Sequence, residues 1–388
     1  MVTAGVVELV ALPAGPHAAD VIPAIVSRRR RPTRNGRLLC QLARTEVPSI
    51  PIFPFLLAFC AIACNFSTFG EVLGELNTGS GACRASSTLT CRGNVLKIRA
   101  GYDIAFNCFQ EVPMVLMLSV HPSRQTEILT DHTIRISPFI EARDYVDGFG
   151  NICTRLVAPA GLIEIRNEFV IEDGGLQDAV VPHAAQVPLH ELPDEALVYL
   201  LGSRYCDTQK LTDLACAMFG PISGGWQRVQ AICDYVQNRI QFGYHFARND
   251  RTAYEGHEER VGVCRDFAHL AVTLCRCINI PARYCTGYLG DIGVPPDPAP
   301  MDFSAWFEVY LGGRWYTFDA RHNHPRIGRI VIARGRDAAD VAIATTFGPA
   351  QLARFTVMTE EVRECGAFPI QPSMMPPRVD LQARPQFA

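Results

Sequence analysis

Residues 262–270, Gly-Val-Cys-Arg-Asp-Phe-Ala-His-Leu, place a cysteine where a loop changes into a helix. From Phe267 onward, apolar side chains recur every three or four positions, which predicts an amphipathic helix with one buried face. Cys264 lies in the first turn, where unpaired N–H groups and the positive end of the helix dipole favour a thiolate, the nucleophilic form. Asp266 in the same turn complements that dipole. Taken alone, this cysteine would more often be structural than nucleophilic, because the chain contains 15 cysteines.

Two apolar runs further along the chain predict a β-hairpin. Residues 304–311 and 314–320 flank the Gly-Gly pair at 312–313, which is a strong signal for a two-residue turn. Such a turn fixes the register, and it places Asp319 on the face of the hairpin opposite the apolar core side chains. Ser304 then lies diagonal to Asp319, within side-chain reach. An Asp319 that pointed into the apolar core would contradict this register.

The order of these features resembles the transglutaminase-like superfamily, whose members carry a papain-type cysteine site. The family pattern has a G-x-C-x-D helix start, a helix that ends in a Gly-Ile-Pro-Ala-Arg-like segment, His-Ala-Trp on one strand and Asp on the next. The corresponding residues in this chain are Gly262-Val-Cys-Arg-Asp266, Asn279-Ile-Pro-Ala-Arg283, Ser304-Ala-Trp306 and Asp319. The resemblance covers roughly residues 190–350, the usual extent of one domain. More closely, the chain is similar to bacterial transglutaminase-like cysteine peptidases with an N-terminal β region.

The resemblance implies that Cys264 is the nucleophile and that Asp319 orients the catalytic base. The base itself is missing, because Ser304 stands where the family has its histidine. A Cys–His–Asp site needs an imidazole that accepts the thiol proton and returns it to the leaving group. A serine hydroxyl has no usable pKa near neutrality, so Ser304 cannot replace the imidazole.

Four other histidines are candidates for the base, and none is placed at the cysteine by its spacing. His269 lies five residues beyond the cysteine, about 140° round a helix, and so points elsewhere. His322 falls on the opposite strand face from Asp319 if the strand continues. His245 and His257 precede the cysteine in a loop region that could fold over it. Each is more often a surface or structural histidine, so the base stays unassigned.

The chain divides into four segments by composition and periodicity. Residues 1–94 lack sustained periodicity, and we expect them to be disordered or absent from the native product. Residues 95–182 alternate polar and apolar side chains between turn residues, which predicts a β-sandwich-like N-terminal module. Residues 190–350 carry helical patterns and then the hairpin, which predicts a papain/transglutaminase-like core of helices packed on an antiparallel sheet. With a C-terminal tail at 351–388, the predicted fold class is α+β.

An apolar run at residues 50–64, interrupted by proline, bears on the expected location. The run is short for a membrane span, and the segment before it is too long for the n-region of a signal peptide. We therefore expect a cytoplasmic bacterial protein, with export as the alternative if residues 50–64 act as a signal. The odd number and irregular spacing of the cysteines also favour a reducing compartment.

Composition argues against several other classes of protein. The net charge is −3, and no basic stripe with interleaved aromatics follows the N-terminal segment, so we expect no nucleic-acid partner. The cysteines form no C-x-x-C pair, so we expect neither a metal ion nor another cofactor. The expected partner is a peptide or protein substrate, and no membrane partner is expected.

Two function classes remain. The first is a cysteine peptidase, amidase or acyl transferase that forms a thioester through Cys264 on a peptide or amide substrate, with its base from an unexpected place. The second is a catalytically inactive family member that serves as a binding or scaffold protein. The family resemblance favours the first class, and Ser304 favours the second.

Overall fold

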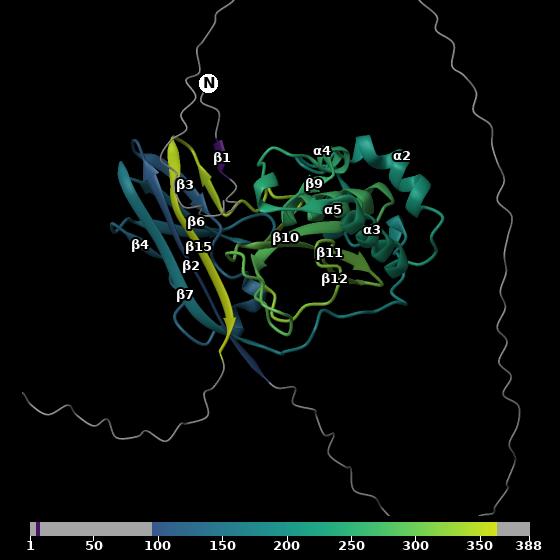
Figure 1. The fold of residues 1–388 in the computed structure, drawn as a ribbon, viewed down its shortest axis with the longest axis horizontal. Coiled ribbons are helices and arrows are strands. Elements are labelled where there is room, and N and C mark those ends of the chain that lie inside the picture. Colours follow the sequence, from purple (N-terminus) through teal and green to yellow (C-terminus); the bar gives the residue numbers. More distant parts are fainter. Residues whose placement is uncertain (1–4, 8–94, 363–388) are drawn as a thin grey trace, which may run out of the picture. The chain divides into compact units, whose positions relative to one another are not determined.

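The structure, a computed structural model, describes residues 5–7 and 95–362 (Figure 1). The fold is α+β, as predicted, with antiparallel sheets and few helices. The expectations for the rest of residues 1–94 and for residues 363–388 lie outside the described residues. In the part of the chain that the structure describes, no helix is both long enough and apolar enough to cross a membrane.

The N-terminal β region contains two sheets. The first has the strand order β15-β2-β7-β4, with β2 Leu96–Cys108, β4 Arg135–Ser137, β7 Gly161–Asp173 and β15 Ala350–Glu361. The second has the order β1-β14-β3-β6-β5, with β1 Gly5–Val7, β3 Val112–Leu116, β5 Ala142–Val146, β6 Ile152–Ala158 and β14 Ala344–Thr346. One hydrophobic core takes side chains from both sheets, as in a β-sandwich.

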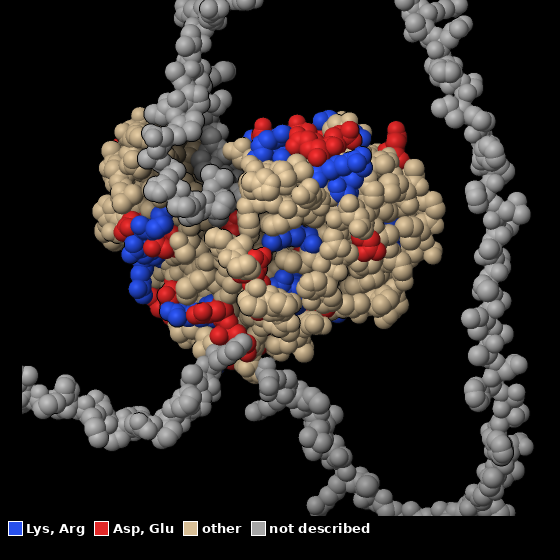
Figure 2. Space-filling model, in the orientation of Figure 1, with Lys and Arg blue, Asp and Glu red and all other residues tan. Residues whose placement is uncertain are grey.

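The pairing of β2 with β7 shows how the sequence pattern builds this region. The two strands pair along their full length of 13 residues, and alternate residues of β2 from Ile98 to Phe106 are buried in the core. The outward residues form ion pairs such as Arg99 with Glu168, and charged side chains gather over these strands in Figure 2. On its other side β2 pairs with β15. Residues 351–361, which the sequence assigned to a tail, therefore complete this sheet.

The second region packs helices on an antiparallel sheet. The sheet has the order β12-β11-β10-β13, with β10 Ala282–Tyr288, β11 Ser304–Leu311, β12 Arg314–Phe318 and β13 Ile330–Gly335. The helices are α1 Asp194–Leu197, α2 Thr208–Phe219, α3 Trp226–Arg239, α4 Ala253–Glu259 and α5 Cys264–Cys277. The short elements are the 3-10 helices η1 Pro122–Glu127, η2 Leu189–Glu191, η3 Val198–Leu200 and η4 Tyr244–Phe246, and the parallel pair β8 Gln241–Phe242 and β9 Val261–Gly262.

Helix α5 lies at the centre of this region (Figure 1). It contacts α2, α3 and α4 as well as strands β10 and β11. Every residue from Arg265 to Arg276 is buried, so neighbouring elements cover the polar face as well as the apolar face that the sequence predicts. The helix ends as expected, because Asn279 takes a left-handed φ of 60° and β10 begins just after Pro281.

The hairpin of β11 and β12 has the predicted register. Gly312 and Gly313 have φ of 53° and 88°, which the tight primed turns of hairpins require. Phe307 pairs with Phe318, and both side chains belong to the core that the sheet shares with the helices. Strand β12 ends at Phe318, so Asp319 lies just beyond the ladder. The position of Asp319 therefore depends on the turn that follows.

A chain that begins at Val95 is expected to fold independently. The core side chains of both regions, among the described residues, lie between Leu96 and Val357. Deleting residues 1–94 removes only the short strand β1 from the described part of the fold. One cooperative thermal transition should remain, with Tm lowered by no more than about 5 °C. Thermal melting of both chains measures this, and insolubility or a much larger drop in Tm would show that the deleted residues stabilise the body.

Candidate active site

Cys264 is the first residue of α5, and Asp266 fixes the backbone at this helix start. The Asp266 carboxylate accepts a hydrogen bond from the Val263 N–H at 2.9 Å, which satisfies one of the donors that a helix start leaves unpaired. Gly262 makes room for that carboxylate, because a Cβ at this position would lie 2.7 Å from the Asp266 side chain. The spacing G-x-C-x-D thus has a geometric cause: the aspartate caps the turn, and the glycine admits the aspartate.

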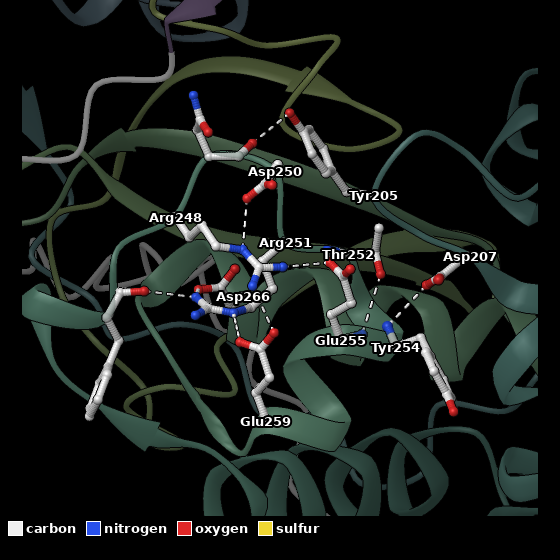
Figure 3. A network of polar contacts seen from close by, with 12 residues as sticks. Tyr205, Asp207, Arg248, Asp250, Arg251, Thr252, Tyr254, Glu255, Glu259 and Asp266 are labelled. Atoms are coloured by element: carbon white, nitrogen blue, oxygen red, sulfur yellow. Dashed lines mark hydrogen bonds and ion pairs between the residues drawn. The ribbon is translucent and has the colours of Figure 1, made fainter. Parts of the chain in front are cut away.

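A buried ion pair holds the same carboxylate (Figure 3). Arg251 donates to Asp266 at 3.0 Å and to Glu259 at 3.0 Å. The side chains of Arg251 and Asp266 are only 4% and 1% exposed. Thr252 and Glu255 form a capping box at the start of α4, beside this pair. The network ties α4 and the loop before it to the first turn of α5, a role for Asp266 beyond the dipole effect that the sequence indicates.

The turn after β12 brings Asp319 and His322 together. Asp319 Oδ1 accepts hydrogen bonds from the backbone N–H groups of Arg321 (3.0 Å) and His322 (3.1 Å). Asp319 Oδ2 lies 2.8 Å from Nδ1 of the His322 imidazole. The sequence placed His322 on the opposite face from Asp319 only if the strand continued, and this condition is not met because β12 ends at Phe318 and the chain turns at Ala320. Aspartate commonly starts a turn by accepting such N–H groups, so Asp-Ala-Arg-His at 319–322 contained a usable signal.

A buried arginine also binds the Asp319 oxygen that faces His322. Arg329 donates to Asp319 Oδ2 at 3.0 Å and to Asp178 at 2.9 Å, and its guanidinium lies over the Trp306 ring. Burial opposes ionisation of Asp319, but the Arg329 charge and the hydrogen bonds from His322 outweigh it and hold the pKa of Asp319 well below its usual range. Asp319 is thus an ionised carboxylate among polar partners and lies outside the apolar core, in agreement with the predicted register.

Cys264, Ser304 and His322 line one cavity of about 60 Å³. The lining also includes Tyr244, Arg321, Arg326 and the acidic residues Asp291, Asp297 and Asp302. Asp319 does not line this cavity and is connected to it through His322. In a neutral His322 whose Nδ1–H donates to the ionised Asp319 carboxylate, Nε2 is the ring nitrogen that can accept a proton. Among the described contacts His322 makes no hydrogen bond to the Cys264 sulfur, and such contacts often tighten only when substrate binds.

The other candidate histidines lie elsewhere. His269 is fully buried, and its Nε2 accepts a backbone N–H at 3.1 Å, so it is structural, as the helical angle predicts. His257 is hydrogen-bonded to a tyrosine hydroxyl at 2.7 Å. His245 packs against a neighbouring phenylalanine ring. Of the histidines in the described part of the chain, His322 is the one that shares the cavity with the cysteine.

Comparison with known proteins identifies the family. The family model of the transglutaminase-like superfamily matches residues 212–320, from α2 to the start of the Asp319 turn. The crystal structure of a Cytophaga hutchinsonii protein, provisionally described as a cysteine protease, is similar to this one, with a TM-score of 0.61 and 31% sequence identity. The match covers 70% of this chain and 92% of that protein. The chain belongs to the transglutaminase-like superfamily.

Two mycobacterial relatives are described as uncharacterized proteins. The Mycobacterium leprae protein ML0607 is 26% identical over 240 residues, which cover 57% of this chain and 80% of that protein. The Mycobacterium tuberculosis protein Rv2569c is 32% identical over 119 residues, which cover 27% of this chain and 38% of that protein. The match to the second relative therefore spans less than half of its length.

In this transglutaminase-like protein the cysteine is a protonated thiol at neutral pH. Burial raises the pKa of Cys264 to about 11, although the charge of Arg321 opposes the effect; Asp302 raises the pKa further. The expectation that the helix start makes Cys264 a thiolate is therefore wrong for the unliganded protein. The cost of ionising a sulfur that is partly removed from water acts against the effect of the helix dipole. Chemistry at Cys264 requires a base that removes its proton.

Replacing Asp266 by asparagine tests what holds Cys264 of this transglutaminase-like protein in place. Asp266→Asn keeps the shape of the side chain but leaves the buried Arg251 with only the partly exposed Glu259 as a charge partner. We expect the free energy of unfolding to fall by about 3 kcal/mol, as when one partner of a buried ion pair is removed. Urea denaturation measures this value.

The control for that variant is Asp250→Asn in the same network. Asp250 pairs with Arg248, but its side chain is 71% exposed. An exposed pair contributes little, so the expected loss is under about 0.5 kcal/mol. Equal losses in the two variants, or no loss for Asp266→Asn, would show that the buried pair does not hold the start of α5.

Proposed function

We propose that this protein is a cysteine hydrolase or acyl transferase that forms a thioester through Cys264 on a peptide or amide substrate. The observation that carries the proposal is the His322–Asp319 pair, whose imidazole lines the same cavity as Cys264. This imidazole supplies the base that Ser304 does not. The Cytophaga hutchinsonii relative is described provisionally as a cysteine protease, which supports a peptide substrate.

The reaction follows from the groups that can move a proton. The Cys264 sulfur attacks the substrate carbonyl carbon while Nε2 of His322 takes the thiol proton, and the carbonyl oxygen becomes negative. When the C–N bond breaks, the imidazolium returns the proton to the leaving amine, and the acyl group stays on sulfur as a thioester. Water or a second amine then attacks the thioester by the same proton route, and Cys264 regains its proton. Hydrolysis and acyl transfer therefore use the same residues.

Asp319 makes this proton route favourable. It holds the Nδ1–H of His322, so that the acceptor nitrogen is Nε2, and it stabilises the imidazolium that forms during the reaction. Arg329 keeps Asp319 ionised, so Asp319 orients and stabilises the base without taking a proton itself. The first turn of α5 adds the positive end of its dipole beside Cys264, where negative charge develops.

A catalytically inactive binding or scaffold protein is the second candidate, and two observations favour it. Ser304 replaces the histidine of the family pattern, and burial raises the pKa of Cys264 to about 11. If His322 did not reach the sulfur, no base would remove the thiol proton. The cavity could then bind a ligand but could not catalyse a reaction. The two candidates differ in whether His322 matters for turnover.

Substitutions at 322 and 304 decide between them. On a panel of peptide amides and activated esters, His322→Gln is expected to lower kcat/KM by about 10²–10⁴-fold, the usual contribution of a positioned base. Cys264→Ala should abolish turnover because no thioester can form. Ser304→His alone should change kcat/KM by less than about threefold, because the site already has a base. In the His322→Gln background, Ser304→His should restore part of the activity, since position 304 lines the same cavity.

The matched control is His324→Gln, which removes a histidine two residues along the chain that does not line the cavity. Its kcat/KM should equal that of the wild type. An inactive wild type that gains activity only with Ser304→His would contradict a base role for His322 and support the inactive protein. Activity that survives Cys264→Ala would contradict both candidates.

A further inference from the structure

The Cys264 sulfur lies in a cavity with charges of both signs. Its lining includes the acidic Asp291, Asp297 and Asp302 as well as Arg321, Arg326 and His322. Asp266 lies in the first turn of α5, two residues after Cys264. Burial and the nearby carboxylates all oppose a negative sulfur. The proposed reaction nevertheless passes through a sulfur that has lost its proton, so a compensating positive charge is needed.

Arg326 and Arg265 are already paired elsewhere. Arg326 donates to the Gly290 carbonyl at 2.9 Å and lies 3.4 Å from Asp291. Arg265 follows the cysteine in the chain, but it lies 3.4 Å from the Asp266 carboxylate and stacks over an aromatic ring. Both guanidinium groups therefore face carboxylates, and their charges are largely neutralised at close range.

Arg321 differs from both. Within the described part of the chain it forms no ion pair with a carboxylate, although it lines the cavity beside Cys264. Its guanidinium lies 3.8 Å from the centroid of the Phe242 ring, and the Tyr244 hydroxyl also interacts with it. Its backbone N–H is donated to Asp319. The aromatic rings and the turn hold the Arg321 guanidinium in place without neutralising it. Its positive charge therefore stays available to the cavity.

We propose that the Arg321 guanidinium is the cation that stabilises negative charge on the Cys264 sulfur. The inference rests on the proposed function, because a deprotonated sulfur matters only if Cys264 reacts. It also gives the turn at 319–322 three tasks: Asp319 orients, Arg321 supplies positive charge, and His322 moves the proton. The charge on the guanidinium, rather than its shape, is the property that the sulfur requires.

Alkylation of Cys264 tests this without any substrate. At about pH 8 the rate with iodoacetamide follows the small fraction of thiolate, which peptide mapping by mass spectrometry can assign to Cys264. Arg321→Gln is expected to slow alkylation of Cys264 roughly tenfold, the effect of removing one nearby charge from a partly solvated site. Arg321→Lys keeps the charge and should stay within about threefold of the wild type.

Arg314→Gln is the matched control. Arg314 also stacks on an aromatic ring, 4.7 Å from the Tyr316 centroid, but it does not line the cavity. Its replacement should leave Cys264 alkylation unchanged. Alkylation in Arg321→Gln at the wild-type rate or faster would overturn the proposal, because the side chain would then only cover the thiol. Equal slowing in Arg321→Lys would also overturn it, because shape and not charge would be responsible.

A measurement on the unmodified protein covers the case in which Arg321→Gln does not melt cooperatively. Anionic iodoacetate and neutral iodoacetamide are compared on Cys264 and on free cysteine. A guanidinium facing the sulfur should raise the iodoacetate-to-iodoacetamide rate ratio severalfold above that of free cysteine. A ratio at or below that of free cysteine would overturn the proposal. Because alkylation requires no turnover, these results stand apart from the activity panel: a protein that shows the Arg321 effect but turns over no substrate would contradict only the proposed function.

Discussion

The site depends on one buried carboxylate, Asp319. Its two oxygens accept two backbone N–H groups, the His322 imidazole and the Arg329 guanidinium. A buried charge is tolerated only with such a full set of donors, so the carboxylate dictates where each donor lies. The backbone bonds close the turn that carries Arg321 and His322. The guanidinium links the end of the hairpin to Asp178 in the connector from the β region.

This arrangement explains how a transglutaminase-like protein can have serine at position 304. The base need not come from β11 if the turn after β12 delivers an imidazole to the same cavity. Ser304 lines the cavity of about 60 Å³ together with His322 and Cys264. In the proposed mechanism, Cys264 and Asp319 keep the positions of the family pattern, and His322 takes the role of the base in place of position 304.

Local signals in the sequence predicted much of the fold. The start and end of α5, the Gly312-Gly313 turn and the hairpin register each follow from a few neighbouring residues, and the structure has all of them. Contacts between distant parts of the chain could not be predicted from the sequence. Strand β15 pairs with β2 from the far end of the described chain, and helices and strands from both before and after α5 pack around it.

The candidate site was likewise predictable where local motifs define it and not where distant contacts do. Cys264 and Ser304 share a cavity, as their positions in the motifs indicated, but the side of His322 could not be predicted without knowing where the strand before it ends. Asp319, directly after the end of β12, pairs with Arg329, and Arg329 also pairs with Asp178; no local pattern in the sequence reveals these contacts. The thiolate expectation failed for a related reason. Burial of the sulfur is a tertiary property, and it outweighs the helix dipole that can be read from sequence.

The central claim is that His322 deprotonates Cys264 for attack on an acyl carbon. Rapid mixing with an activated ester, followed by quenching and intact-protein mass spectrometry, tests it most directly by following the acyl group onto Cys264. The account predicts a single acyl adduct on Cys264 in the wild type, and acylation slower by at least about 10²-fold in His322→Gln. Acylation of Cys264 at the same rate in both proteins would contradict it.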